Sequence, residues 1–357
     1  METLKNMIDQ EHEQVVFCYD KSSGLKAIIA IHNTILGPAL GGLRLWPYAC
    51  EKDALFDVLR LSRGMTYKNA AAGLNLGGGK AVILGDPSIK SEALYRAFGR
   101  NVQSLGGRYV TAEDVNTSTE DIMQIREETN YVTGLPETAG GGGNPSPITA
   151  IGTLEGIKIS VLRRLGAASL KGITVAVQGV GHVGEHLCEL LHEEGAGLIV
   201  SDIDPRAVQK MVKQYSATGV EHEQIYAVDA DVFAPCALGA VINEQTIPQF
   251  KFTVVAGAAN NQLLDENKHG ILLKEKNILY APDYIINAGG VINCYYELIQ
   301  EYSRDSVIKK VKNIYQTLET IFQIAEEQNI ATHQAAAHFA EKRIETIGNL
   351  QRTYLGD

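Results

Sequence analysis

The sequence predicts an α/β protein of two domains, an N-terminal α/β domain and a second domain built on a doubly wound parallel sheet. Three observations predict this class. The chain has 357 residues, which is more than one ordinary compact core contains. Short apolar runs alternate with stretches of helical periodicity along most of its length. A segment rich in glycine and proline, Ala139 to Pro147, divides these alternating runs into two groups.

Composition and charge narrow the range of partners. Hydrophobic residues make up 45% of the chain and charged residues 21%, which is the profile of a globular protein. The formal net charge is -10 and Lys and Arg form no long block, so we expect no nucleic-acid partner. No apolar run reaches the ~18 residues needed to span a bilayer, and the N-terminus has no apolar leader. We therefore expect a cytoplasmic protein without a membrane partner.

The cysteines carry little information about chemistry. There are 5 of them, scattered along the chain without the spacing of a zinc site or a disulfide framework. We expect reduced thiols and no bound metal.

The first domain is predicted from strand-like runs and helical periods between about residues 13 and 135. The strand-like runs are QVVFCYD, KAIIAIHN and AVILGDP, and the helical periods cover residues 51–64 and 91–105. The segment AGGGGNPSP then blocks both helix and strand. We place the crossover to the second domain there.

The second domain is predicted to begin with a helix from Ile148 to about Gly166. The helix leads into ITVAVQG, an apolar β-branched run typical of a strand buried on both faces. Further apolar runs alternate with helical or polar segments, as a doubly wound sheet requires, at residues 198–202, 232–236, 253–257 and 279–283.

Two helical patterns, residues 306–328 and 332–347, close the chain, and the last can pack back on the first domain. We therefore assign residues 1–140 and a C-terminal helix at about 330–357 to the first domain. Residues 146–329 form the second.

A dinucleotide-binding turn is predicted at the start of the second domain. Its GxGxxG pattern directly follows a strand and directly precedes a helix, and consists of Gly179, Val180, Gly181, His182, Val183 and Gly184. In such a Rossmann-type turn the glycines allow a tight bend, close approach of the pyrophosphate and helix-strand packing. The helix N-terminus adds free N–H groups and a positive dipole.

An acidic residue at the end of the next strand favours NAD. Asp202 lies 18 residues after Gly184, with Ile203 beside it, and a carboxylate there can bind the adenosine ribose hydroxyls. The same carboxylate would repel the 2′-phosphate of NADP, and no Arg occurs until Arg206. We expect NAD as the cofactor.

Two lysines and an aspartate in the first domain are candidates for chemistry on a carboxylate substrate. Lys68 in MTYK and Lys80 in GGGK are 12 residues apart, and three glycines before Lys80 indicate a tight bend or a close ligand. One lysine could bind a carboxylate while the other acts as a base, because each lowers the pKa of the other. Asp114 ends the predicted strand YVTAED, where it could move a proton or simply form a turn.

Several stretches of the chain together resemble the leucine, phenylalanine and valine dehydrogenases, a branch of the superfamily that includes glutamate dehydrogenase. The resemblance runs from about Glu13 to the C-terminus. The matching stretches are GLKAIIAIHNTILGPALGGLR, LRLSRGMTYKNAAAGLNLGGGK, GRYVTAEDVNT, GNPSPITAIG, VAVQGVGHVGEHLC, FAPCALGA, AGAANNQL and YAPDYIINAGGVIN.

The resemblance implies a fold and a set of residue roles. The first domain would bind substrate and mediate oligomerisation, the second would bind NAD, and a cleft would separate them. Lys68 would hold the substrate carboxylate, Lys80 would be the general base, and Asp114 would assist proton transfer. Other implied substrate positions are Leu40, Gly41, Gly42, Met65, Ala112, Asn261, Val291 and Cys294. Implied cofactor positions beyond the glycine turn and its acid are Thr149, Cys236, Ala237, Asn261 and Asn287.

The implied reaction is oxidation of an L-amino acid by NAD to an imino acid, followed by hydrolysis to a 2-oxo acid and ammonia, and its reverse. The apolar pocket favours an aliphatic side chain, because a glutamate-like group would be left unpaired there. In the resemblance, Ala112 and Val291 match the enzymes that act on leucine, which we expect to be the best substrate. Asn116, Leu43 and the Tyr295-Tyr296 pair depart from that pattern, so phenylalanine or tryptophan stays an alternative.

Other classes remain as alternatives. A non-catalytic dinucleotide-binding sensor could share the fold. A hydroxy-acid dehydrogenase would need a His and carboxylate pair, whereas His182, His186 and His192 lie in or just beyond the glycine turn. The resemblance also implies a homo-oligomer based on dimers, up to an octamer.

Overall fold

The computed structural model describes residues 3–237 and 239–350, which form two compact units. Within the described residues, the first unit comprises 3–144, Cys294–Tyr302 and 340–350. The second comprises Pro145–Asn293, apart from residue 238, and Ser303–Phe339.

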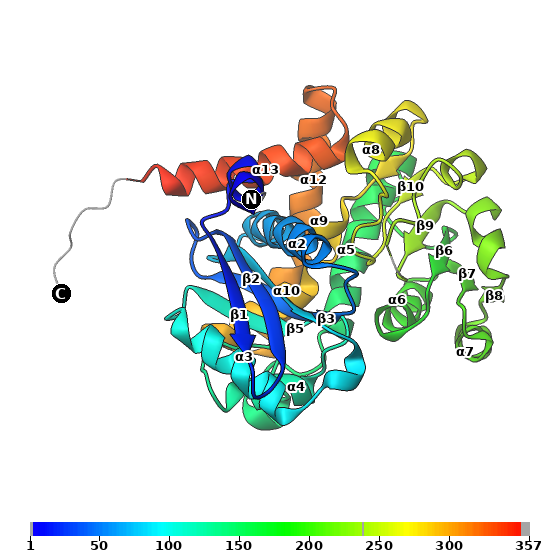
Figure 1. Cartoon of the computed structure of the whole chain (residues 1–357). Helices are drawn as coiled ribbons and strands as arrows, with labels where there is room; N and C mark the ends of the chain where they lie inside the picture. The colour runs from blue at the N-terminus through cyan, green and yellow to red at the C-terminus, as the bar shows by residue number, and fades with distance from the viewer. Residues whose placement is uncertain (1–2, 238, 351–357) are drawn as a thin grey trace. The chain divides into compact units, whose positions relative to one another are not determined.

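The first unit is built on a five-stranded mixed sheet in the order β1-β2-β4-β3-β5 (Figure 1). Strands β1 and β2 are antiparallel, as are β2 and β4, whereas β3 runs parallel to both β4 and β5. The strands are β1 (Gln14–Asp20), β2 (Leu25–Asn33), β3 (Ala39–Trp46), β4 (Gly77–Leu84) and β5 (Tyr109–Glu113).

Helices cover both faces of this sheet. Helix α2 (Glu51–Ala71) packs on one face, where Val58 and Leu59 meet Ala30 and Val82 in an apolar cluster. Helices α3 (Glu92–Ser104) and α4 (Thr119–Arg126) pack on the other face, where their side chains join a second and larger apolar cluster. The unit also contains helix α1 (Thr3–Asp9) and the short 3-10 helices η1 (Pro87–Ile89) and η2 (Glu137–Ala139).

Two local predictions for the first unit were wrong in ways that bear on the site. Helix α2 does not stop near residue 64 but continues to Ala71 and carries Lys68 in its last turn. The three glycines before Lys80 do not form the tight bend that was one of the two expectations, because they belong to strand β4. Helix α2 packs so closely there that a β-carbon on Gly78 would lie 2.1 Å from Oγ1 of Thr66. Strand β3, which was not predicted, lies between β4 and β5.

The second unit is built on a six-stranded parallel sheet in the order β11-β10-β9-β6-β7-β8. This is the order of a Rossmann-type sheet, in which the chain winds first to one side of β6 and then to the other. The predicted doubly wound sheet is therefore confirmed. The strands are β6 (Thr174–Gln178), β7 (Gly197–Ser201), β8 (Thr218–Gly219), β9 (Val232–Pro235), β10 (Val254–Val255) and β11 (Leu279–Tyr280).

Helices connect and flank these strands. The predicted helical run 306–328 is broken at Asn313 into α11 and α12. Helix α5 begins and ends within two residues of the predicted positions, and α6 follows the glycine turn as predicted. The set comprises α5 (Ser146–Leu165), α6 (His182–Glu193), α7 (Pro205–Tyr215), α8 (Glu266–Glu275), α9 (Asp283–Ile286), α11 (Arg304–Lys312) and α12 (Ile314–Glu327), with 3-10 helices η3 (His222–Ala227) and η4 (Ile247–Gln249).

The units differ from the predicted domains in two places. Residues 294–302 belong to the first unit, because the Glu297 carboxylate accepts hydrogen bonds from the backbone N–H groups of Gly134, Leu135 and Gly142. Helix α10 (Gly289–Leu298) therefore contributes residues to both units.

Helix α13 (Thr332–Gly348) joins the first unit only from Ala340 onward. From this part of the helix Arg343 donates to the carbonyl of Leu74, and Glu341 accepts from the Tyr67 hydroxyl at 2.8 Å. The second half of the helix thus packs on the first unit.

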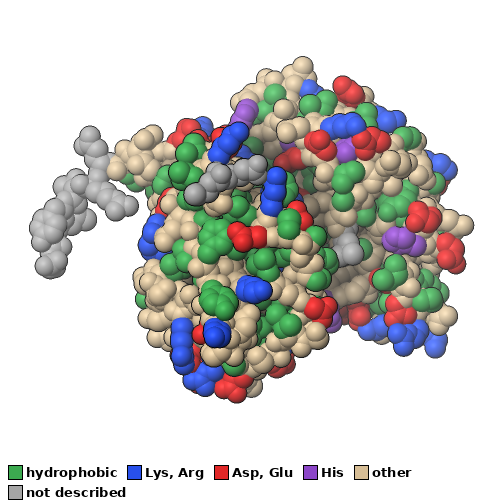
Figure 2. Space-filling model, viewed as in Figure 1, with side chains coloured by type: hydrophobic (Ala, Val, Ile, Leu, Met, Phe, Trp, Pro, Cys, Tyr) green, Lys and Arg blue, Asp and Glu red, His purple; other side chains and the backbone are tan. Residues whose placement is uncertain are grey.

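The described surface carries side chains of both charges. On the face drawn in Figure 2, cationic and anionic side chains are interspersed over both units. No helix within the described ranges is long and apolar enough to cross a membrane. Among these same residues, no group of three or more His, Cys, Asp or Glu side chains is arranged to hold a metal ion.

Candidate active site

The α2-facing side of the first sheet gathers the candidate substrate residues. Side chains alternate between the faces of a strand, and the pairing of β3 with β4 and β5 aligns their even-numbered positions. Leu40 pairs with Gly78, and Gly42 pairs with Ala112. The residues brought to this face are Leu40, Gly42, Arg44, Lys80 and Ala112, with Asp114 immediately after β5.

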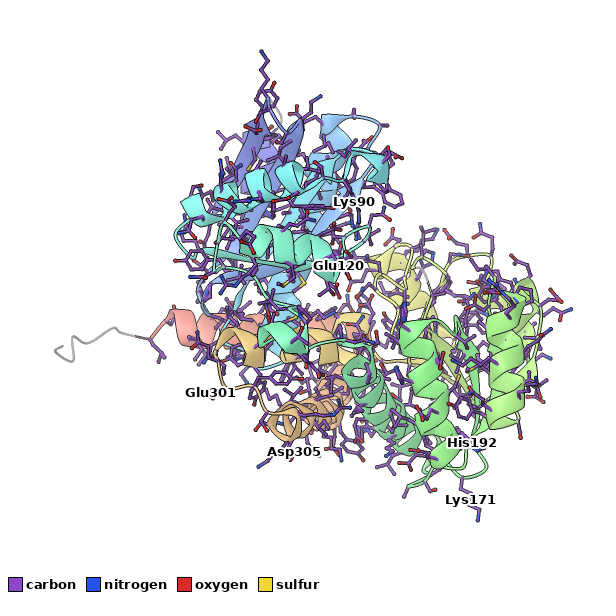
Figure 3. All side chains as sticks on the ribbon, turned by 90° about the horizontal axis from the view of Figure 1, so that it is seen from below. Lys90, Glu120, Lys171, His192, Glu301 and Asp305 are labelled. Atoms are coloured by element: carbon purple, nitrogen blue, oxygen red, sulfur yellow. The ribbon has the colours of Figure 1, made fainter. Side chains whose placement is uncertain are left out.

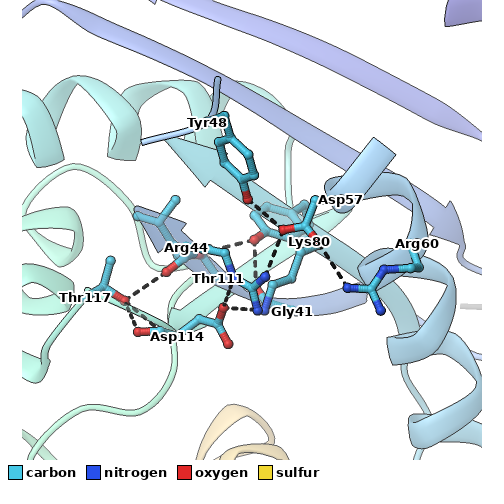
Figure 4. Close-up of polar contacts among 11 residues, drawn as sticks. Gly41, Arg44, Tyr48, Asp57, Arg60, Lys80, Thr111, Asp114 and Thr117 are labelled. Carbon is cyan, nitrogen blue, oxygen red and sulfur yellow. Dashed lines mark hydrogen bonds and ion pairs between the residues drawn. The ribbon is translucent and has the colours of Figure 1, made fainter. Parts of the chain in front are cut away.

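Lys80 and Asp114 form a buried ion pair at the centre of this face (Figure 4). Nζ of Lys80 lies 3.0 Å from Oδ2 of Asp114, and the lysine side chain is only 6% exposed. Burial lowers the pKa of Lys80 below its ordinary value although Asp114 opposes that shift. Burial alone would raise the pKa of Asp114, but the charges of Lys80 and Arg44 outweigh it and hold this pKa at about 2. The pair thus joins a permanent carboxylate to an amine that releases its proton more readily than a surface lysine.

Glycines make room for this arrangement. A β-carbon on Gly42 would lie 2.8 Å from Cβ of Asp114, and one on Gly41 would lie 1.6 Å from the carbonyl oxygen of Gly79. Any side chain at these two positions would therefore displace the neighbouring strands. Both glycines were predicted to border the substrate, and the structure gives each a packing requirement as well.

The remaining substrate candidates of the first unit lie on helices α2 and α10. Lys68 and Met65 are half-buried in the last two turns of α2. Cys294 is half-buried on α10, where its carbonyl accepts from Thr133. Burial raises the pKa of its thiol to about 12, with the charges of Glu297 and Glu113 acting in the same direction and that of Lys68 opposing them. Lys68, Met65 and Cys294 therefore share one unit with the ion pair.

Sequence reasoning missed the groups behind the ion pair. Nε of Arg44 lies 3.0 Å from Asp114 Oδ2, and Nη1 of Arg44 lies 2.8 Å from Oδ2 of Asp57 on α2. The Tyr48 hydroxyl donates to the same Asp57 oxygen at 2.7 Å. A signal for Arg44 was present, because it stands two positions after Gly42 and strand alternation places it on the same face.

The glycine turn of the second unit has the geometry that a dinucleotide requires. Gly179 has a φ of +89°, and a β-carbon on it would lie 2.7 Å from Ala237. A β-carbon on Gly184 would lie 2.0 Å from the carbonyl oxygen of Gly179, so helix α6 and the turn pack closely. Gly181 faces open space at the start of α6 and precedes exposed His182. Val180 and Val183 lie one position before Gly181 and one position after His182. The turn therefore fits a pyrophosphate at the helix N-terminus.

Asp202 is tied to this turn. Its Oδ2 accepts the backbone N–H of Val180 at 2.8 Å, and its Oδ1 accepts that of Asp204 at 2.9 Å. The next residue, Ile203, is 85% exposed. The carboxylate is thus fixed at the carboxyl end of β7, beside the glycine turn.

Other predicted cofactor residues also lie at the carboxyl end of this sheet. Cys236 and Ala237 directly follow β9, and the Cys236 amide donates to the carbonyl of Gln178 at 2.7 Å. Asn287 donates to Oδ1 of Asn260 at 2.7 Å. Ligands of Rossmann-type sheets bind at this end of the strands. Of the other candidates in this unit, Asn261 has a φ of +51°, Thr149 lies in the first turn of α5, and Val291 is buried in α10.

The three histidines near the turn, His182, His186 and His192, all lie on helix α6, in the second unit. His192 lies in the last turn of α6, at the opposite end from the glycine turn (Figure 3). Its ring centroid lies 5.6 Å from that of Tyr215, with the two rings tilted by 48°. His186 lies 3.6 Å from Glu189, one turn along the same helix surface.

Asn116, one of the departures from the pattern of the enzymes that act on leucine, has a role in the turn after β5. Its φ of +59° lies in the left-handed region, which Asn adopts more readily than most residues with a side chain, and its side chain donates to the carbonyl of Leu45 at 3.0 Å. Tyr295 and Tyr296 pack against each other edge to face at 5.8 Å.

Comparison with known proteins agrees with this geometry. Residues 12–131 match the model of the Glu/Leu/Phe/Val dehydrogenase dimerisation domain, and residues 200–351 match that of Glutamate/Leucine/Phenylalanine/Valine dehydrogenase. Leucine dehydrogenase of Geobacillus stearothermophilus is 56% identical over 99% of this chain and 96% of its own length. The chain belongs to the Glu/Leu/Phe/Val dehydrogenase family.

Other members of this family are also similar. L-tryptophan dehydrogenase of Nostoc punctiforme is 51% identical over 96% of this chain and 95% of its own length. The crystal structure of L-tryptophan dehydrogenase from that organism superposes with a TM-score of 0.86 at 48% identity, covering 96% of this chain and 99% of that chain. The family consists of amino-acid dehydrogenases, which implies a dinucleotide cofactor, and the glycine turn fits one.

Proposed function

We propose that the protein catalyses the NAD-dependent oxidative deamination of an aliphatic L-amino acid, with leucine as the best substrate, and the reverse reductive amination. The Lys80–Asp114 ion pair carries this proposal. Its lysine is buried and has a lowered pKa, so the amine can act as a base, and the chain belongs to a family of amino-acid dehydrogenases. The leucine dehydrogenase relative, at 56% identity, supports the substrate.

The residues of the first unit divide the steps of this reaction. Lys68 holds the substrate carboxylate, and the backbone at Gly41 and Gly42 helps to orient it. Bound NAD supplies the acceptor for the hydride that leaves the α-carbon, which gives an imino acid. Neutral Lys80 takes a proton from water as the water attacks the imino carbon, and Asp114 stabilises the ammonium that results. Lys80 then returns this proton to the nitrogen, and the carbinolamine collapses to the 2-oxo acid and ammonia as its hydroxyl proton passes back to Lys80.

The proposed side-chain pocket accounts for an aliphatic substrate. Leu40 and Ala112 lie diagonally across β3 and β5 on the α2-facing surface of the sheet, and both are small to medium apolar groups. A carboxylate on the substrate side chain would have no partner among apolar residues, which disfavours glutamate. Cys294, in the same unit, is proposed to line this pocket as well.

Asp202 supports NAD rather than NADP. Both of its oxygens are fixed by backbone N–H groups near the glycine turn, so the negative charge stays where the adenosine ribose is expected. A 2′-phosphate would meet that charge at close range.

Initial rates test the proposal. Purified full-length protein is supplied with NAD or NADP and each of leucine, valine, phenylalanine, tryptophan and glutamate. We expect the highest kcat/KM with leucine and NAD, lower rates with valine, and equal amounts of NADH, ammonia and 2-oxo acid formed. No release of ammonia with any amino acid would contradict the proposal and favour a dinucleotide-binding sensor.

A second candidate is an enzyme that prefers an aromatic amino acid. The L-tryptophan dehydrogenase relative, at 51% identity, favours it. A higher kcat/KM for tryptophan or phenylalanine than for leucine in the same assay would establish this alternative.

The relatives also support an assembly. The first unit matches a family model described as a dimerisation domain. We propose a cytoplasmic homo-oligomer built from dimers, up to an octamer. The mass measured by light scattering after gel filtration tests this, and a monomer at micromolar concentration would contradict it.

A further inference from the structure

Arg44 joins the ion pair to helix α2. Its guanidinium lies between two carboxylates that come from different elements, Asp114 after β5 at 3.0 Å and Asp57 on α2 at 2.8 Å (Figure 4). Arg44 is 19% exposed, and the two carboxylates are 16% and 22% exposed, so solvent screens these contacts weakly. Lys80 and Arg44 both contact Oδ2 of Asp114. The position of this oxygen therefore depends on both cations.

The far end of the bridge is itself anchored. Asp57 accepts from the Tyr48 hydroxyl at 2.7 Å and from Nη2 of Arg60 at 3.1 Å. Because Asp57 is held in this way, Arg44 links the Asp114 turn to a helix that packs along β4. Helix α2 also carries Lys68 in its last turn. One arginine thus connects the elements that carry all three proposed working residues.

Burial and the charge of Arg44 favour the neutral form of Lys80, whereas the carboxylates of Asp114 and Asp57 favour the protonated form. With Lys80 protonated, the cluster holds three cations, the others being Arg44 and Arg60, against the carboxylates of Asp57 and Asp114. Loss of the Lys80 proton makes the cluster neutral. After burial and the opposing charge of Asp114, the charge of Arg44 further lowers the pKa of Lys80, whereas Asp57 raises it. Beyond these groups, the titratable neighbours of Asp114 are Tyr109 and Glu113.

We propose that Arg44 is a positioning residue of the reaction, which holds the Asp114 carboxylate against the Lys80 amine and makes that amine more ready to give up its proton. This inference rests on the proposed function, because it assigns a purpose to the base in that reaction. A merely structural bridge would stabilise the fold but would leave the proton affinity of Lys80 unchanged.

The pH dependence of turnover separates these roles. In Arg44→Met, Lys80 loses a repelling charge, so the acidic limb of kcat/KM for deamination moves to higher pH, by on the order of one pH unit. At a pH on that limb the rate falls about tenfold, and it recovers at higher pH. Asp57→Asn removes an attracting charge instead and moves the limb to lower pH. Ionisation of the substrate amine is common to all variants and cancels in the comparison.

Two further variants complete the design. Arg44→Lys keeps the charge but cannot span both carboxylates, so kcat falls while the limb stays near that of the wild type. Arg96→Met is the matched control, because Arg96 also bridges two carboxylates, Glu92 on α3 and Glu128 just after α4, but at an exposed surface. The acidic limb of kcat/KM for Arg96→Met should stay at the pH of the wild type.

The acetylation rate of Lys80 by acetic anhydride, followed by mass spectrometry across pH, reports the same change without turnover. An unchanged Lys80 profile in both Arg44→Met and Asp57→Asn would overturn the inference, and if Arg44→Met fails to fold, Asp57→Asn alone decides. Failure of the wild type to deaminate leucine would instead contradict the proposed function, and the labelling experiment would still test Arg44.

Discussion

Lys80 and Asp114 lie 3.0 Å apart on one face of the first sheet, although their strands β4 and β5 are separated by β3, which has glycine at the position between them. The lysine comes from β4 and the aspartate from the turn after β5, while Gly42 of the intervening β3 leaves the space that they need. An amine of lowered pKa and a permanent carboxylate are thereby kept in contact.

Removing the charge of Asp114 should reduce turnover and change the response of stability to acid. We expect Asp114→Asn to lower kcat by about 10²-fold or more, because Lys80 loses its charged partner. The pKa of Asp114 is held at about 2, below the unfolded value of about 3.9. The resulting stabilisation is complete above the unfolded value and is lost as pH falls toward the folded value.

Urea unfolding of the wild type and Asp114→Asn between about pH 2.5 and pH 6 measures this contribution. The difference in free energy of unfolding should shrink by on the order of 2 kcal/mol toward the acid end of this range. A difference that stays constant across the range would contradict the assigned charge state.

The size of the side-chain pocket should set the choice between aliphatic and aromatic substrates. Ala112→Gly removes a methyl group from the buried face beside Gly42 and enlarges the proposed pocket. We expect kcat/KM for phenylalanine relative to leucine to rise by roughly tenfold, within the range of about 1–3 kcal/mol per methylene. Ala97→Gly on α3, packed against the opposite cluster, is the control for loss of a methyl group. An unchanged ratio in Ala112→Gly would place the pocket elsewhere.

The charge of Asp202 should set the preference for NAD. Asp202→Asn keeps an oxygen that can accept the Val180 N–H but removes the charge. We expect the kcat/KM ratio of NAD to NADP to fall about tenfold, as loss of roughly 1.4 kcal/mol of repulsion would produce. Asp204→Asn, two residues on, should leave the ratio within about twofold. A ratio unaffected by Asp202→Asn would mean that another group excludes the phosphate.

Much of the second unit could be predicted from its sequence, because each element carries a local signal. The glycine turn lies between an apolar β-branched strand and a helix, and Asp202 follows the next strand. The first unit was harder. Strand β3 contains Gly41 and Gly42, which weaken a strand pattern, so neither the strand nor the position of Arg44 was predicted. The Arg44–Asp57 bridge joins residues of a strand and a helix, and no local periodicity encodes such a contact.

The assignment of residues 294–302 to the first unit was not predicted either, because it depends on contacts between residues distant in the sequence. These contacts lead to a stability prediction. One carboxylate, Glu297, accepts three backbone N–H groups of the loop before the second unit. Glu297→Ala should therefore lower the free energy of unfolding by about 2–3 kcal/mol. Glu301→Ala, an exposed residue four positions on (Figure 3), should change it by less than about 0.5 kcal/mol. Equal urea midpoints for the two variants would show that the loop does not depend on Glu297.

The central claim is that Lys80 is the base of an NAD-dependent amino-acid deamination. The most direct test is the kcat of Lys80→Ala with leucine and NAD, measured on protein whose affinity for NADH equals that of the wild type. The buried ion pair predicts a fall in kcat of about 10³-fold or more, with NADH binding retained. A kcat within a few-fold of the wild type would contradict the role of Lys80 and the account built on it.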